Sequence, residues 1–93
     1  MDKIEELQKE RGSEYGKYEI NASYVGSKIL DFIHHYKKQN NGDEPDIAKL
    51  GSLCHIWIKE ARLLHEPVNE DTLLDYESYV NLHRKYIEYK DPF

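Results

Sequence analysis

Six apolar residues in the second half of the chain follow one another at alternating steps of three and four. They are Ile47, Leu50, Cys54, Trp57, Ala61 and Leu64. This spacing places all six side chains on one stripe of an α-helix and is typical of a helix that packs lengthwise against another helix. A half-buried strand would instead alternate apolar and polar residues at every second position. The pattern therefore predicts an all-α fold with a main helix over residues 45–65.

A second apolar stripe with the same spacing follows after a short connection and predicts a helix over residues 70–89. Pro67 interrupts the helical pattern, and Asn69 is a suitable N-cap for the new helix. Because so few residues join the two helices, we expect them to pack as an antiparallel hairpin. The residues of this second stripe are Leu73, Tyr76, Val80, His83 and Ile87.

Two further helices are predicted before this hairpin. One covers residues 21–39 and ends at an Asn-Asn-Gly sequence. The other has Asp2 as its N-cap, is expected to stop at Gly12, and leads into a turn, so that residues 1–18 form an N-terminal helix and turn. We expect residues 1–93 to form one domain, a small bundle of about four helices that self-association through the apolar stripes would complete.

The composition excludes several classes of function. The net charge is −5 and the basic residues are dispersed, so nonspecific binding of nucleic acid is not expected. No apolar run approaches the roughly 20 residues that a membrane-spanning helix needs, and the N-terminus lacks the pattern of a signal peptide. We therefore expect a cytoplasmic protein without membrane partners. The single cysteine, Cys54, cannot form an internal disulfide and is expected to act as a small apolar residue.

Charged and polar residues gather on the two helices of the predicted hairpin. Residues 45–65 carry one polar stripe, and residues 70–89 carry another. In an antiparallel hairpin that turns near residues 66–70, Arg62 would lie level with Asp75, and Lys59 would lie level with Tyr79. The first stripe consists of His55, Lys59, Arg62 and Glu66, and the second of Asp71, Asp75, Tyr79 and His83.

This arrangement has two interpretations. As structure, it is a partly buried network of ion pairs that fixes the register of the hairpin, which is common between packed helices. As function, it is a polar site in which Lys59 and Arg62 hold phosphates while Asp71 and Asp75 hold a divalent cation such as Mg²⁺. Two carboxylates alone make a sparse metal site. The histidines are not spaced for zinc, and Cys54 and His55 are consecutive on a helix, so they diverge and do not predict a catalytic thiol.

Two segments resemble a family of small phage and prophage proteins. That family has an arginine, a Tyr-Gly pair four residues later and then an asparagine, a pattern that Arg11, Tyr15-Gly16 and Asn21 match within residues 10–21. It also has Lys-x-x-Arg at a helix end, followed by Asp, Asp and Tyr on the next helix. The matching residues of this second motif are Lys59, Arg62, Asp71, Asp75 and Tyr79.

These phage proteins look like distant relatives of the all-α nucleoside triphosphate pyrophosphohydrolases of the MazG type. The resemblance implies an all-α bundle that assembles as a dimer or higher oligomer. MazG-type enzymes bind Mg²⁺ through Glu-x-x-Glu on one helix and Glu-x-x-Asp on the next. This chain has no Glu-x-x-Glu on the second or third predicted helix, where Lys59 and Arg62 stand instead. Whether it catalyses a reaction is therefore left open.

The sequence leads to one main functional hypothesis and two alternatives. The main hypothesis is a phage-type accessory protein that binds a nucleotide or a related phosphorylated small molecule, with pyrophosphohydrolase activity as an extension of that idea. The alternatives are a non-enzymatic protein that binds and inhibits a host defence or replication protein, and a purely structural bundle. In the main hypothesis, Arg11, Lys59 and Arg62 neutralise phosphates, and Tyr15 and Tyr79 stack on a base. Asp71 and Asp75 either orient the basic groups or hold one Mg²⁺.

Overall fold

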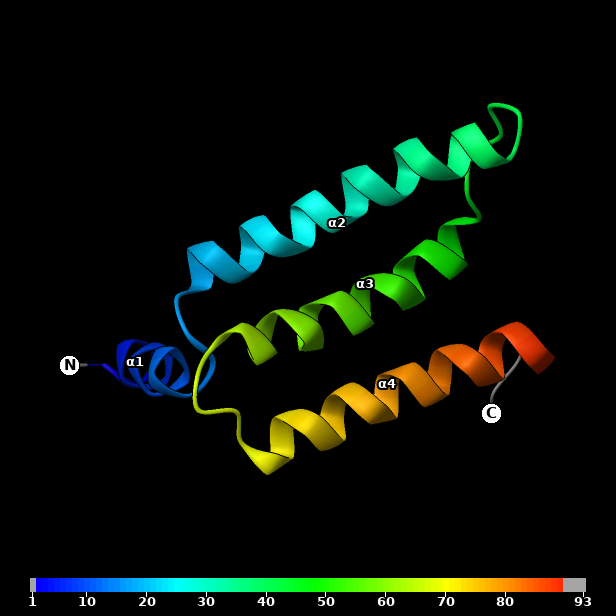
Figure 1. Ribbon diagram of the computed structural model, residues 1–93. Helices are drawn as coiled ribbons and strands as arrows, with labels where there is room; N and C mark the ends of the chain where they lie inside the picture. Colours follow the sequence, from blue (N-terminus) through cyan, green and yellow to red (C-terminus); the bar gives the residue numbers. More distant parts are fainter. Residues whose placement is uncertain (1, 90–93) are drawn as a thin grey trace.

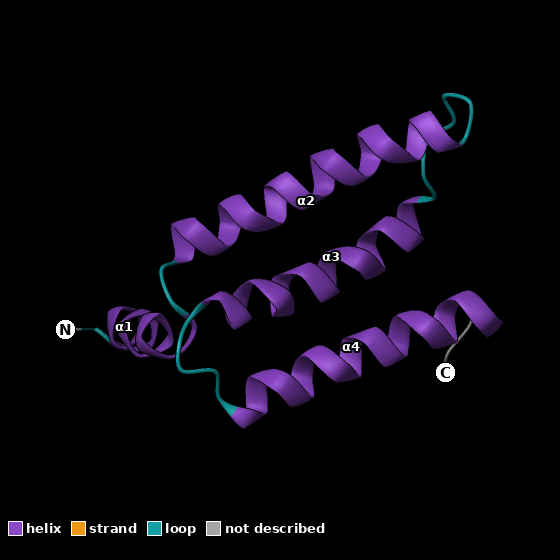
Figure 2. Ribbon diagram, in the orientation of Figure 1, coloured by secondary structure: helices purple, strands orange, loops and turns teal. Residues whose placement is uncertain are grey.

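The computed structural model describes residues 2–89 and confirms the all-α fold. Within that range the chain forms four α-helices and one short 3₁₀ helix, and no strand (Figures 1 and 2). Their bounds are α1 Lys3–Tyr15, α2 Tyr18–Gln39, α3 Ile47–Ala61, η1 Arg62–Leu64 and α4 Glu70–Tyr89.

The three long helices lie side by side with α3 in the middle (Figure 1). Helix α3 runs antiparallel to both α2 and α4, as the predicted hairpin required. Helix α1 is set across the end of this layer, beside the connection between α3 and α4. The molecule is accordingly elongated, with extents of 51 × 28 × 25 Å.

Capping residues explain most of the helix ends. Asp46 begins α3 by accepting a hydrogen bond from the backbone nitrogen of Lys49 at 3.0 Å, and Asp2 caps α1 in the same way as expected. The prediction that α1 stops at Gly12 is wrong. Gly12 lies inside the helix, and α1 ends at Gly16, whose φ of 87° is a conformation that glycine adopts without strain.

The remaining helix bounds differ from the predictions by a few residues. Helix α2 begins at Tyr18 rather than at residue 21, while α4 covers the predicted residues 70–89. The helix predicted over residues 45–65 is shorter, because Asp46 is its N-cap and the chain tightens into η1 after Ala61. Arg62, the first residue of η1, belongs to the site described below.

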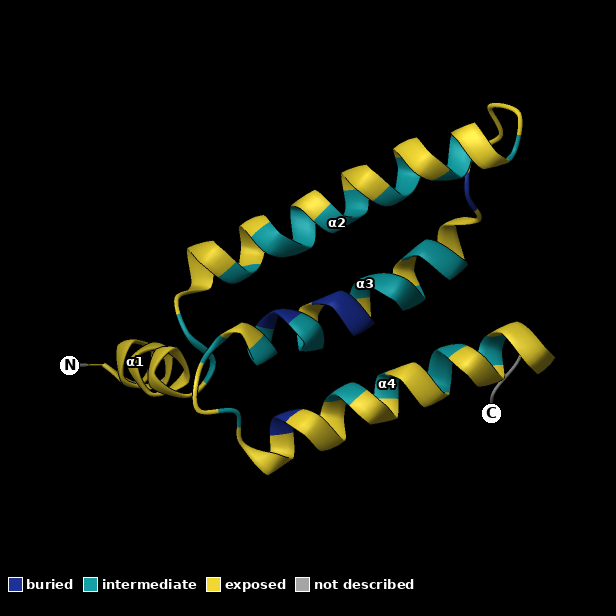
Figure 3. Cartoon of the chain, in the orientation of Figure 1, coloured by how far each residue is buried: buried dark blue, intermediate teal, exposed yellow. Residues whose placement is uncertain are grey.

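The core lies around the C-terminal half of α3. Ile56, Trp57 and Ala61 are the buried apolar residues within the described part of the chain (Figure 3). Trp57 packs against Phe32 of α2, with ring centroids 5.7 Å apart. The single stripe predicted for this helix is only half right, since Ile47 at its start is 86% exposed. Helix α3 is central and contacts a helix on each side, so it buries two faces.

Helix α4 buries only part of its predicted stripe, namely Tyr76 and His83, which are half-buried. Leu73, Val80 and Ile87 are exposed, whereas Thr72 is buried and His83 is half-buried against α3. His83 is joined to Ser52 by a hydrogen bond of 2.8 Å. The contact stripe of α4 is therefore largely polar and aromatic, and it cannot be recognised from apolar periodicity alone. Its members are Thr72, Tyr76, Tyr79, His83 and Tyr86.

A polar cluster joins α2 to α3. The Glu60 carboxylate accepts a hydrogen bond of 2.5 Å from the Tyr24 hydroxyl and forms an ion pair with Lys28 at 3.3 Å. Hydrogen bonding to Glu60 is the main reason that the pKa of Tyr24 and the pKa of Lys28 are both raised. Glu60 is thus committed to holding these two helices together. None of the helices described here is long and apolar enough to cross a membrane.

Candidate functional site

Two arginines from distant parts of the sequence flank one tyrosine ring. Tyr15 is the last residue of α1, and Arg62 is the first residue of η1. The Cζ atom of Arg62 lies 4.2 Å from the centroid of the Tyr15 ring, and the Cζ atom of Arg11 lies 6.0 Å from it. Both distances are within the range of cation–π interactions. We call Arg11, Tyr15 and Arg62 the arginine–tyrosine cluster.

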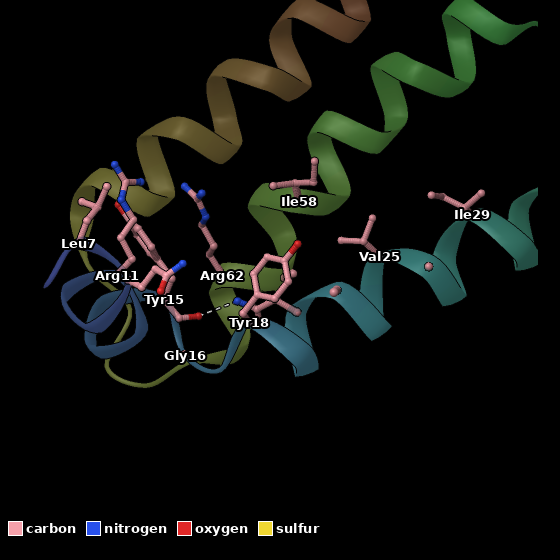
Figure 4. A pocket seen from close by; sticks show the side chains of 14 residues that line it. Leu7, Arg11, Tyr15, Gly16, Tyr18, Val25, Ile29, Ile58 and Arg62 are labelled. Carbon is pink, nitrogen blue, oxygen red and sulfur yellow. Dashed lines mark hydrogen bonds between the residues drawn. The ribbon is translucent and has the colours of Figure 1, made fainter. Parts of the chain in front are cut away.

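The backbone around Tyr15 is fixed by contacts with two other elements. The Asn21 side-chain amide of α2 donates a hydrogen bond of 2.8 Å to the carbonyl oxygen of Tyr15 (dashed in Figure 4). The His65 ring nitrogen Nε2 lies 3.1 Å from the carbonyl oxygen of Ser13 and hydrogen-bonds to it. A Cβ atom at Gly16 would lie 3.2 Å from the Cβ of His65, so glycine also permits this close approach. The end of α1 is therefore attached to both α2 and the segment after α3.

The cluster stands at one end of a groove between α2 and α3 (Figure 4). The groove has a volume of about 950 Å³. The side chains of Val25 and Ile29 from α2 and Ile58 from α3 form its apolar part, and Tyr18 stands beside the cluster at the start of α2. An elongated ligand with one charged and one apolar part would match this division.

The positive charges of the arginine–tyrosine cluster are not neutralised locally. Among residues 2–89, no carboxylate lies within 4.0 Å of the guanidinium group of Arg11 or Arg62. Arg62 is half-buried, so its charge is partly removed from water. Helix α2 also begins next to the cluster, and its N-cap residue Lys17 provides no side-chain capping bond. The partial positive charge of a helix N-terminus adds to the two arginines.

Lys59 and Tyr79, which were predicted in the same site, belong to a separate group. The Lys59 ammonium lies 3.5 Å from a carboxylate oxygen of Asp75 and 5.4 Å from the centroid of the Tyr79 ring. The His55 ring is also stacked on the Tyr79 ring, with centroids 5.4 Å apart. We call His55, Lys59, Asp75 and Tyr79 the lysine–aspartate cluster.

Half of the predicted register across the hairpin is found, because Lys59 lies at the Tyr79 ring as expected, and the other half is not. Arg62 was expected level with Asp75, but Asp75 pairs with Lys59 instead. Residues three apart at a helix end point about 60° apart, so Lys59 faces Asp75 of α4 while Arg62 faces the Tyr15 ring of α1. As a result Lys59 has a carboxylate partner and Arg62 has none within the described chain.

The predicted Mg²⁺ site at Asp71 and Asp75 stays a prediction. Both aspartates are exposed, and Asp75 is already paired with Lys59. In the part of the chain that the structure describes, no three His, Cys, Asp or Glu side chains come together as a metal-binding group. A cation held by these two aspartates would need further oxygen ligands from water or from a bound phosphate.

Sequence reasoning missed Tyr18, which lines the groove, and His65, which lies beside Gly16. Tyr18 and His65 were not singled out, although Tyr18 begins an i, i+4, i+7, i+11 pattern with three apolar residues of α2 that marks one helix face. His65 has no such signal, because its role depends on the position of α1. Asn21 belonged to the motif of the resemblance, and its hydrogen bond to Tyr15 gives that motif a physical function. The three apolar residues are Ala22, Val25 and Ile29.

No family model, curated protein or solved structure matches this chain. The resemblance to phage proteins and to MazG-type enzymes is therefore neither supported nor contradicted by comparison.

Proposed function

We propose that the protein binds a nucleotide or a related phosphorylated small molecule, with its phosphates at the arginine–tyrosine cluster. The observation that carries this proposal is the pair of guanidinium groups on one tyrosine ring, with no carboxylate partner among the described residues. In an acidic chain of net charge −5, two uncompensated arginines at one place favour an anionic ligand. A phosphate oxygen would complete the charge pairing that the protein leaves open.

Arginine suits phosphate because its planar guanidinium can donate two parallel hydrogen bonds. Stacking of Arg62 on Tyr15 holds the guanidinium plane in place before the ligand arrives, which lowers the entropy lost on binding. The two arginines come from α1 and η1, and they meet because Asn21 and His65 attach the end of α1. Asn21 and His65 are therefore positioning residues in this proposal.

The groove favours a ligand with a flat organic part. Tyr18 is 86% exposed beside the arginine–tyrosine cluster, and its ring is free to stack on a base. This role replaces the one predicted for Tyr79, whose ring is already covered by His55 and Lys59. Tyr15 is likewise occupied by the arginines, so it orients cations and does not stack on the ligand.

The same proposal includes a relationship of this chain to phage proteins with a MazG-like bundle. If the bundle is shared, hydrolysis of the bond between the α- and β-phosphates would need a metal site rebuilt around Asp71 and Asp75. The proposal therefore places binding first and hydrolysis as its extension. Measuring binding and pyrophosphate release separately distinguishes the two.

The test is isothermal titration calorimetry, which measures equilibrium binding of a panel of ligands with and without Mg²⁺. The panel consists of nucleoside mono-, di- and triphosphates and inorganic pyrophosphate. We expect binding that strengthens with the number of phosphates. The variant Arg62→Ala should weaken it about 10- to 100-fold, which corresponds to the loss of charged hydrogen bonds. The matched control is Arg84→Ala, because Arg84 of α4 is exposed and pairs with Glu88 at 2.8 Å.

Absence of binding to every member of the panel would refute the proposal. Equal loss of affinity in Arg62→Ala and Arg84→Ala would show a nonspecific charge effect and would refute it as well. Pyrophosphate release that disappears in Asp75→Ala would establish the hydrolytic extension. Release that survives in Asp75→Ala would remove Asp75 from the chemistry.

A second candidate is a protein that binds and inhibits a host protein. It is favoured by the exposed apolar residues of α4, since Leu73, Val80 and Ile87, 40–53% exposed, form a stripe at steps of seven. Substitution of Val80 by Glu would abolish such an interaction and leave nucleotide binding unchanged. The opposite pattern, loss of nucleotide with the partner retained, is expected for Arg62→Ala.

A further inference from the structure

The molecule exposes more surface than a folded monomer of its size. The structure exposes 7212 Å², whereas a compact monomer of 11.1 kDa exposes about 5,650 Å². The radius of gyration is 15.6 Å, against about 12.3 Å for a compact domain of this length. The excess of roughly 1,500 Å² is in the range of the area that each chain of an obligate homodimer buries.

An uncharged face runs along α2 and α3 and provides a place for that burial. On α3 it consists of Ile47, Gly51, Cys54 and Ile58, spaced 4, 3 and 4, and on α2 it includes the apolar lining of the groove. Ile47 is 86% exposed and Ile58 is 41% exposed. We call this surface the α2–α3 face. The residues that α2 contributes are Ala22, Val25, Gly26, Ile29 and Ile33.

Two glycines of the α2–α3 face have open space above them. A Cβ atom at Gly26 or at Gly51 would meet no atom within 4 Å, so neither glycine is required for packing within the monomer. Glycine in the middle of a helix costs up to about 1 kcal/mol relative to alanine. Close approach of another helix is a reason for such residues at these two positions.

We infer that a second copy of this chain covers the α2–α3 face, so that the protein is a two-fold symmetric dimer. A two-fold axis brings identical faces together, which requires a self-complementary surface. The α2–α3 face meets that requirement because it carries no charge, whereas the chain as a whole has a net charge of −5 and would repel itself elsewhere. The four helices α2 and α3 of both copies then form one shared core. The arginine–tyrosine cluster stands at the end of this face, beyond its apolar residues. In the dimer the second copy covers the apolar part of the groove, and the ligand of the proposed function is held by the cluster and Tyr18.

The test uses light scattering coupled to size-exclusion chromatography on the full chain over a wide concentration range. We expect a mass of about 22 kDa, twice that of one 11.1 kDa chain. Gly51→Glu should convert the protein to a monomer that keeps its helical circular dichroism, because the new side chain meets open space in a single chain. Gly26→Glu should do the same and decides the matter if the first variant fails to fold.

The matched control is Gly12→Glu. Gly12 is also helical and also has nothing within 4 Å of a Cβ atom, but it lies on α1 outside the α2–α3 face. This variant carries the same change of charge and should remain a dimer. A monomeric wild-type protein at every concentration would overturn the inference. So would a dimer that survives both Gly51→Glu and Gly26→Glu, or one that is broken by Val80→Glu on α4 instead.

Discussion

The arginine–tyrosine cluster and the lysine–aspartate cluster both place a cation beside a tyrosine ring, yet only the lysine–aspartate cluster pairs its cation with a carboxylate. Both place a cation on a tyrosine ring near the C-terminal end of α3. In one, the Lys59 ammonium also has a carboxylate 3.5 Å away on α4. In the other, Arg62 faces α1, where a second cation is its neighbour on the ring. A cation with an internal partner stabilises a fold, and a cation without one is available to a ligand.

The difference arises from the positions of the two residues around the end of α3. Lys59 lies within the α-helical part of α3, and Arg62 begins the 3₁₀ segment that follows it. With 3.6 residues per turn, side chains three residues apart point in directions that differ by about 60°, so Lys59 and Arg62 address different helices. The comparison therefore separates a structural cluster from a candidate binding site that sequence spacing had merged.

The largest expected effect comes from the packing on which both clusters depend. Trp57 is buried against Phe32, and α3 must stay on α2 for either cluster to form. Trp57→Ala should lower the free energy of unfolding by about 3 to 5 kcal/mol. Urea denaturation followed by circular dichroism measures this. The control is Leu74→Ala, since Leu74 is 53% exposed and should cost much less. Equal costs would mean that the core lies elsewhere.

Removal of the α4 N-cap should lower the stability by a smaller amount and should loosen only the lysine–aspartate cluster. Asn69 caps α4 by accepting hydrogen bonds of 2.8 Å and 2.9 Å from the backbone nitrogen and the hydroxyl of Thr72. Asn69→Ala should cost about 1 to 2 kcal/mol and increase hydrogen exchange in the first turns of α4. Asn69→Asp retains an acceptor and should restore most of the stability. Increased exchange in α1 instead of α4 would contradict the separation of the two clusters.

Acid should destabilise the contact between α3 and α4 through His83. Burial is the main cause that lowers the pKa of His83 below 6.5, and the nearby charge of Lys49 adds to it. Above pH 6.5 the ring is neutral in both the folded and the unfolded chain. As the pH falls below 6.5, the unfolded chain takes up the proton first, so the stability should decrease. Denaturation midpoints measured between neutral and acidic pH test this.

The variant His83→Gln isolates that contribution from the other histidines. Glutamine cannot take up a proton, so the loss of stability on acidification should be smaller in the variant than in the wild type. Glutamine can still hydrogen-bond to Ser52, which keeps the comparison close. Identical pH profiles would show that His83 does not contribute to the acid sensitivity.

Periodicity was sufficient to predict the helices but not which faces they bury. The 70–89 helix matches its prediction because Asn69 provides a clear start, and the all-α class follows from the 3, 4 spacing. The stripe predicted on α4 is partly wrong, because Leu73 and Val80 are exposed and Thr72 is buried instead, while Tyr76 and His83 of the predicted stripe are half-buried. A pattern of apolar residues cannot show which stripe meets a neighbour when two stripes are available on one helix.

The candidate site was predictable in part. Arg11, Tyr15 and Arg62 were all named from the sequence, and the structure brings these three together. Their separation from Lys59 depends on which helix lies beside each side chain, α4 for Lys59 and α1 for Arg62, and the sequence contains no signal for the position of α1. The contributions of Tyr18 and His65 depend on the crossing of α1 over the end of the layer. Such long-range placement is decided by packing and not by local spacing.

The most direct test of this account compares Arg62→Ala with Lys59→Ala in one calorimetric titration with a nucleoside triphosphate. We predict that Arg62→Ala weakens binding about 10- to 100-fold. Lys59→Ala should bind as the wild type does and lose no more than about 1 kcal/mol of stability, as expected for a pair with a largely exposed carboxylate. Loss of the ligand in Lys59→Ala, with full binding in Arg62→Ala, would contradict the account and place the site at the lysine–aspartate cluster.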